Sequence, residues 1–169
     1  MTLQGLFALL PALAAVCFDT DCGRIPNALV VPTLLFGLFF QVMNRGAPGI
    51  LFFLGGAVFP FILLFPLFIF RMLGAGDIKL LMAVGGICGL PSILYILLAA
   101  LSAGAILSFF LMLAGTGFRP RFRYFLTYIS NVFISGKAIP YRKEGIRPEN
   151  FHFSVPILAG VILYAGGVL

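Results

Sequence analysis

Apolar segments long enough to cross a lipid bilayer make up most of the sequence, and this feature decides what the chain can fold into. Of the 169 residues, 62% are hydrophobic and only 9% are charged. A soluble domain is about half apolar and about a quarter charged, so this chain has too little polar surface to cover a water-soluble globule. We therefore predict an all-α integral membrane protein. A spanning helix needs about 20 mostly apolar residues, and about six spans are expected: 3–18, 27–43, 50–70, 78–90, 92–114 and 153–169.

The boundaries between these segments predict their connections. Segment 78–90 would rise only about 20 Å at 1.5 Å per residue, so it is too short to cross the hydrocarbon alone. Gly46–Gly49 and Leu90-Pro91-Ser92 are expected to be tight turns, because Gly and Pro end helices. No flexible linker interrupts the chain, which predicts one polytopic domain over residues 1–169.

The N-terminal segment and the cysteines allow two further interpretations. The segment resembles the apolar part of a signal peptide, but MTLQG has no basic side chain, so we expect a retained first helix. The three cysteines, Cys17, Cys22 and Cys88, lie in or beside apolar segments. They form neither a disulfide framework nor two CxxC pairs, and we expect no metal site and no cofactor.

The basic residues predict an orientation. With six spans, ten of the eleven Lys and Arg residues fall on one face and only Arg45 falls on the other. Basic loops stay in the cytoplasm, so the N-terminus is expected outside and the protein in the inner (cytoplasmic) membrane. The net charge of +6 is then explained by topology and by contact with anionic lipid, and no nucleic-acid partner is required. The ten residues are Arg24, Arg71, Lys79, Arg119, Arg121, Arg123, Lys137, Arg142, Lys143 and Arg147.

One long cytoplasmic loop, residues 117–150, is expected before the last span. Its aromatic part, 122–136, has few charges and is predicted to lie in the membrane interface. The remainder is polar and is expected to be irregular. The pattern leaves open whether the loop is a tether or contacts a substrate.

The acidic residues supply the candidate chemistry. There are only five, and Glu144 and Glu149 belong to the polar loop. Asp19 and Asp21 end the first apolar segment and Asp77 begins the fourth, so the predicted topology brings both places to the cytoplasmic face. Charged residues at membrane depth usually have a function.

Two partly desolvated carboxylates that lie close together share one proton. The ionised group can then take a proton from water while the protonated group polarises a peptide carbonyl, which is aspartic protease chemistry. Gly74 and Gly76 would leave room for a substrate backbone or a neighbouring helix beside Asp77. Spacing alone leaves two other roles open: ion or proton handling, and helix capping, with Asp19 or Asp21 paired to Arg24 and Asp77 at a helix N-terminus.

Two motifs resemble one family. GAGDIKLLMAVGG, residues 74–86, resembles the GxGD motif of the type IV prepilin peptidases and archaeal preflagellin peptidases, which are membrane aspartic proteases. DTDCGRIPN, residues 19–27, resembles the family's first motif, an Asp at the end of span 1 followed by Ile-Pro-Asn. SVPILAG, residues 154–160, loosely resembles the last span.

The resemblance implies residue roles. Asp19 and Asp77 would be the catalytic pair, with acid and base unassigned because a coupled pair titrates jointly. Pro26 would start the second span and Asn27 would hold the loop that presents Asp19. Lys79 would be either an anchor at the interface or a cation that stabilises ionised Asp77. The supporting motif residues would be Ile25, Pro26, Asn27, Gly74, Gly76 and Lys79.

The resemblance also implies a substrate, a prepilin or pilin-like protein whose basic leader is cleaved at the cytoplasmic membrane face. The short connection between the first two spans is similar to the short, peptidase-only form of the family, and no methyltransferase role is expected. Asp21 departs from the family pattern, and its role stays open, as do the cleavage-site rule and the oligomeric state. The alternatives are a non-catalytic membrane assembly factor and a small proton or cation transporter that uses the same aspartates.

Overall fold

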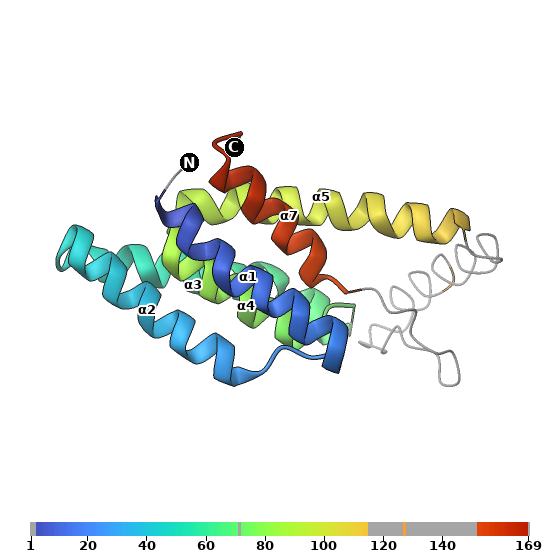
Figure 1. Ribbon diagram of the computed structural model, residues 1–169, viewed down its shortest axis with the longest axis horizontal. Coiled ribbons are helices and arrows are strands. Elements are labelled where there is room, and N and C mark those ends of the chain that lie inside the picture. Colours follow the sequence, from blue (N-terminus) through green and yellow to red (C-terminus); the bar gives the residue numbers. More distant parts are fainter. Residues whose placement is uncertain (1–2, 71, 115–126, 128–151, 169) are drawn as a thin grey trace.

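The computed structural model describes residues 3–70, 72–114, 127 and 152–168, and those residues contain helices and no strand. The predicted all-α class is therefore confirmed. Figure 1 shows a helical bundle in which the start of α1 and the end of α7 lie near each other. The predicted loop 117–150 lies outside the described residues, apart from the helical Thr127. The helices are α1 (Leu3–Cys22), α2 (Asn27–Arg45), α3 (Pro48–Ile69), α4 (Ala75–Cys88), α5 (Leu90–Ala114) and α7 (Ser154–Ala165).

Four of these helices, α1, α2, α3 and α5, are long and apolar enough to cross a membrane. Large apolar side chains cover their outer faces, and Leu10, Leu51 and Ile62 are each about two-thirds exposed or more (68%, 74% and 66%). An outward apolar face is what a lipid environment requires. The four helices therefore make the chain a multi-pass membrane protein, whereas α4 with 14 residues and α7 with 12 are shorter than a full span.

The two predicted turns have different outcomes. Gly46 ends α2 with a positive φ of 63°, and α3 begins two residues later at Pro48, close to the expected turn. The predicted turn at Leu90-Pro91-Ser92 is wrong, because all three residues belong to α5. Gly89 makes the turn instead, with a φ of 82°. Pro91 is tolerated because the first turn of a helix does not need its N–H.

Helix α4 lies at the centre of the bundle, and α1, α2, α3 and α5 all contact it. Nine of its 14 residues are buried, as expected for a helix that is apolar on every side. Glycines allow one of these contacts to be very close. A Cβ atom on Gly56 of α3 would collide with the carbonyl oxygen of Gly85 of α4, and the reverse is also true. Small residues let helix backbones approach in this way, and the contact fixes α4 against α3.

Helix α7 packs against α5 and α1 and runs antiparallel to α1 (Figure 1). At one end, the Ser154 hydroxyl donates a hydrogen bond of 2.6 Å to Asp19 near the end of α1. At the other end, the Tyr164 hydroxyl donates to Gln4 Oε1 over 3.3 Å, near the start of α1. The end of α1, the start of α4 and the start of α7 consequently meet at one end of the bundle.

Candidate active site

Asp19 lies in the last turn of α1. Gly23, with a φ of 63°, ends this helix, and its N–H donates to the Asp19 carbonyl oxygen over 2.9 Å. This left-handed cap is a common end for a helix. It turns the chain toward Ile25, whose side chain is buried.

Ile25 packs against Gly76 in the first turn of α4. A Cβ atom on Gly76 would lie 3.3 Å from the Ile25 Cβ atom, which is a very tight contact. The expectation that Gly76 leaves room for a substrate or a neighbouring helix is therefore corrected: the space holds Ile25 of this chain's own first motif. The first motif thus docks directly onto the second.

Asp77 is the third residue of α4, after the N-cap Gly74. The backbone N–H of Gly74 hydrogen-bonds the Asp77 carboxylate, so the helix-capping role left open by the sequence is part of the geometry. Asp77 lies outside the four candidate spans. Burial, and next the negative charge of Asp19, raise the pKa of the Asp77 carboxyl, while the Gly74 hydrogen bond and His152 act in the opposite direction.

One cavity of about 320 Å³ joins the two predicted motifs. Both aspartates line it although they are far apart in the sequence, so the structure brings the predicted pair together. Its lining also includes two basic side chains and the motif glycines. The full set is Asp19, Gly23, Arg24, Ile25, Gly74, Ala75, Gly76, Asp77 and Lys79.

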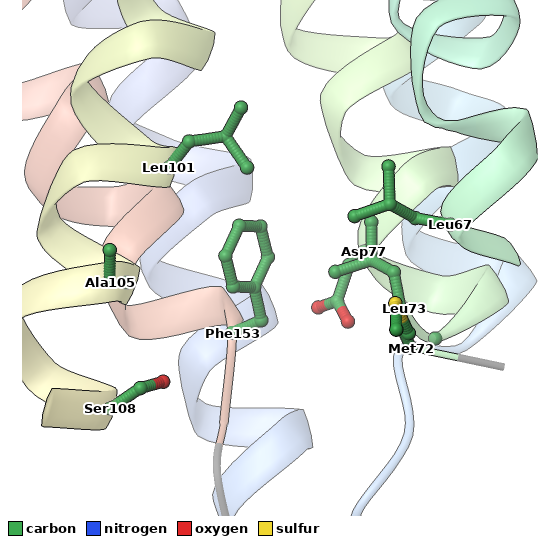
Figure 2. Close-up of a pocket in the computed structure, with 10 residues that line it drawn as sticks. Leu67, Met72, Leu73, Asp77, Leu101, Ala105, Ser108 and Phe153 are labelled. Atoms are coloured by element: carbon green, nitrogen blue, oxygen red, sulfur yellow. The ribbon is translucent and has the colours of Figure 1, made fainter. Parts of the chain in front are cut away.

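A second cavity, of about 260 Å³, lies on another side of Asp77 and is mainly apolar. Figure 2 shows the Asp77 carboxyl group directed into the space that Phe153 faces from the start of α7. Asp77 and Gly74 thus line both cavities, the one with two basic side chains and the mainly apolar one. The second cavity is lined by Leu67, Met72, Leu73, Gly74, Asp77, Leu101, Gly104, Ala105, Ser108 and Phe153.

Two residues that sequence reasoning missed contact Asp19. Ser154 Oγ lies 2.6 Å and His152 Nδ1 lies 3.2 Å from the same oxygen, Asp19 Oδ2. One signal singles out His152 alone, since the chain has a single histidine, next to the last apolar segment and on the face predicted to hold the aspartates; the contacts of both residues with Asp19 depend on the packing of α7.

The expected pairing of Asp19 or Asp21 with Arg24 is not what the structure has. Within the described residues, the basic partner of Asp19 is His152. Asp21 is exposed and makes no hydrogen bond or ion pair with other described residues. Of the two aspartates at the end of α1, only Asp19 lines this cavity, and it is also the one whose spacing to Ile-Pro-Asn matches the first motif.

Lys79 connects the two motifs at a second point. Its Nζ atom donates to Asn27 Oδ1 over 3.0 Å, and Asn27 is the first residue of α2, directly after the N-cap Pro26. Among the described residues, Asp19 and His152 are the side chains with an electrostatic effect on the pKa of the Asp77 carboxyl. Lys79 therefore holds the start of α2 against α4, and the alternative of a cation acting on Asp77 receives no support.

The fold and the cavity define a class: a multi-pass helical membrane protein with two carboxylates at one end of the bundle. The chain belongs to the type IV leader peptidase family, whose sequence profile matches residues 6–109 and so includes both motifs. Comparisons with curated proteins and with solved structures give no match. Family membership indicates a protease of the leader peptidase type, which in general acts on pilin-like precursors.

Proposed function

We propose that the chain is an aspartic endopeptidase that removes the basic leader from prepilin or pilin-like precursors, with Asp19 and Asp77 as its catalytic pair. One observation carries the proposal: these aspartates, 58 positions apart in the sequence, line a single cavity. The negative charge of Asp19 also acts on the Asp77 carboxyl. Such a pair holds one shared proton, which is the starting state that the reaction needs.

The chemistry follows from that shared proton. The ionised carboxylate takes a proton from water as the water oxygen bonds to the peptide carbonyl carbon. The protonated carboxyl group gives its proton to the carbonyl oxygen, which produces a neutral tetrahedral diol. The diol then collapses: the carbon–nitrogen bond breaks, the nitrogen receives a proton from the first carboxyl group, and a diol hydroxyl returns a proton to the second.

The two cavities beside Asp77 support the choice of substrate. A leader peptide is polar and the segment after it is an apolar helix, so the scissile bond lies at a boundary between polar and apolar chain. Asp77 matches this boundary because it lines both the cavity that contains Arg24 and Lys79 and the cavity lined by Leu67 and Leu101. The apolar side of the substrate would lie toward the second cavity.

The distribution of basic residues supports the location. Ten of the eleven Lys and Arg residues fall on the face that carries the aspartates in the six-span topology, and basic loops are retained in the cytoplasm. The proposed site therefore faces the cytoplasm from the inner membrane, where a leader is accessible before its protein is exported. The proposal treats residues 1–169 as one peptidase domain.

The test is cleavage of a purified prepilin-type substrate, with a basic leader and an apolar helix, by the purified protein in detergent or lipid. Asp19→Asn and Asp77→Asn should each reduce cleavage below detection, because each removes one of the two proton-transfer groups. Asp21→Asn is the matched control, since it makes the same change on an exposed residue two positions from Asp19.

Asp21→Asn should retain most of the activity. Full cleavage by either of the other variants would remove that aspartate from the catalytic pair. A wild-type protein that inserts correctly but cleaves no such substrate would contradict the proposal. That result would favour an assembly factor or a proton or cation transporter instead.

A further inference from the structure

The start of α7 contacts Asp19 through two side chains that the proposed reaction does not yet use. Ser154 Oγ and His152 Nδ1 both meet Asp19 Oδ2, at 2.6 Å and 3.2 Å. Within the described residues, these are the side-chain contacts of Asp19, so its other oxygen, Oδ1, is the one that remains for chemistry. The Ser154 side chain is fully buried, and its hydroxyl has no competing contact with water.

The packing of α7 holds these two side chains in place. Phe153, between them, is 8% exposed and fits against Gly104 of α5, where a Cβ atom would lie only 2.8 Å from the phenylalanine ring. Farther along α7, a Cβ atom on Gly160 would lie 2.6 Å from the carbonyl oxygen of Ile96. Because α7 cannot slide along α5 without breaking these contacts, they hold the start of α7, and with it Ser154, in place against α5.

Asp77 has different partners. The described residues give its carboxylate the backbone N–H of Gly74, whereas Lys79, two residues later, is bound to Asn27. The charged or titratable groups around Asp19 in the described residues are His152, Asp77, Arg24 and Lys79, the last two as lining of the shared cavity. Among the described side chains, Asp19 therefore has a hydroxyl donor and an imidazole on one oxygen, Oδ2, whereas Asp77 has neither.

We propose that Ser154 and His152 are positioning residues for Asp19, which they hold as the ionised member of the pair, with Oδ1 directed to the water that attacks the peptide. Asp77 is then the protonated member. This inference rests on the proposed function and assigns the roles that a coupled pair alone leaves open. The proton of the attacking water goes to Asp19 Oδ1, and the proton of Asp77 goes to the substrate carbonyl oxygen.

The experiment compares two variants that each lose one serine hydroxyl group, at Ser154 of α7 and at Ser92 of the neighbouring α5. Ser154→Ala removes the donor to Asp19. Ser92→Ala removes the donor of another short hydrogen bond, which runs over 2.9 Å from Ser92 of α5 to the Tyr164 hydroxyl at the other end of α7. Both variants should insert and unfold like the wild type to within a small shift in melting temperature, and kcat, KM and the pH profile of cleavage are measured for each.

Ser154→Ala should lower kcat by about 10- to 100-fold, the range expected for a lost hydrogen bond to a charged group, with KM nearly unchanged. The acidic limb of its profile of kcat/KM against pH should move to higher pH, because that limb reports the essential base. Ser92→Ala should change neither. His152→Gln changes a side chain that is 24% exposed and should shift the acidic limb of the pH profile in the same direction. If Ser154→Ala does not fold, the pH profile of His152→Gln tests the inference.

Two outcomes overturn the inference while leaving the proposed function intact. In the first, wild type cleaves and Asp19→Asn does not, but Ser154→Ala and His152→Gln keep the wild-type kcat and pH profile. In the second, Ser154→Ala and Ser92→Ala lose activity equally without a shift in the pH profile, which indicates a structural contact only. A wild-type protein that does not cleave defeats the proposed function and this inference together.

Discussion

Asp19 and Asp77 line the same cavity, but different parts of the fold hold them. Asp77 is bound by the first turn of its own helix, through the N–H of Gly74. Asp19 is bound from α7, 135 positions away in the sequence. Different surroundings are how proteins give two carboxyl groups different roles. The pair therefore needs both α4 and α7 to be in place.

Among the single residues of the site, Gly76 has a specific role, because its lack of a side chain leaves space for Ile25. In Gly76→Ala the new methyl group would lie 3.3 Å from the Ile25 Cβ atom, so the loop after α1 must move by a few tenths of an ångström. A misplacement of about 1 Å costs on the order of 100-fold in rate, and this smaller shift should lower kcat by roughly three- to tenfold. Cleavage assays with purified variants measure the effect.

The double variant Ile25→Ala/Gly76→Ala decides between the two interpretations of this glycine. Because a shortened residue 25 can yield to the new methyl group, the double variant should recover part of the activity lost in Gly76→Ala. If Gly76 instead makes room for the substrate backbone, shortening Ile25 brings no recovery, and Gly76→Ala should raise KM rather than lower kcat.

At the scale of elements, the short helix α4 is enclosed by its neighbours, and its closest contact is the glycine pair with α3. Gly85→Val should lower the free energy of unfolding by about 1–3 kcal/mol or more, the usual effect of overpacking, because its side chain would collide with the Gly56 carbonyl oxygen. Thermal unfolding in detergent measures this change.

Gly55→Ala is the matched control for that prediction. It adds a methyl group one position from Gly56, where its nearest neighbour, Leu90 Cβ, lies at an ordinary 3.5 Å. The control should unfold near the wild-type temperature. Equal stability of Gly85→Val and Gly55→Ala would mean that α3 and α4 are not in backbone contact.

The elements also indicate how much the sequence alone can predict. Apolar runs gave the approximate bounds of the helices, because span length and composition are local properties. The turn was misassigned to Leu90-Pro91-Ser92 because a Pro in the first turn of a helix has the same local pattern as a Pro in a loop. The actual break, at Gly89, depends on a positive φ.

The contacts of Ser154 and His152 with Asp19 could not be predicted for a different reason. They depend on how α7 packs against α1 and α5, and no local pattern records that packing. The two aspartates were found because each belongs to a motif in an otherwise apolar chain. The role of Gly76 was misjudged because a glycine shows that space is needed, and only the fold shows which group occupies that space.

At the scale of the whole molecule, the bundle has two different ends. Asp19, Asp77 and the start of α7 meet at one end, while the α2–α3 turn lies at the opposite end of the bundle from the end of α1 (Figure 1). Arg45, beside that turn, has its guanidinium carbon 3.7 Å from the centre of the Phe52 ring, where the cation–π contact contributes about 0.5–1 kcal/mol at an exposed site. A single arginine held in this way does not oppose the predicted orientation, in which the other ten Lys and Arg residues lie on the opposite face.

The orientation is tested by labelling cysteines with a membrane-impermeant maleimide, in intact cells or spheroplasts and in inverted vesicles. Cys22, exposed at the end of α1, should react only in inverted vesicles if the catalytic end faces the cytoplasm, because the reagent cannot cross the bilayer. Ala47→Cys, in the exposed α2–α3 turn, should react only from outside. Cys22 is labelled in a Cys17→Ala background and Ala47→Cys in a Cys17→Ala/Cys22→Ala background, and the buried Cys88 serves as the unreactive control. The reversed pattern would place the aspartates outside, where a cytoplasmic leader cannot reach them, and would contradict the proposed cleavage.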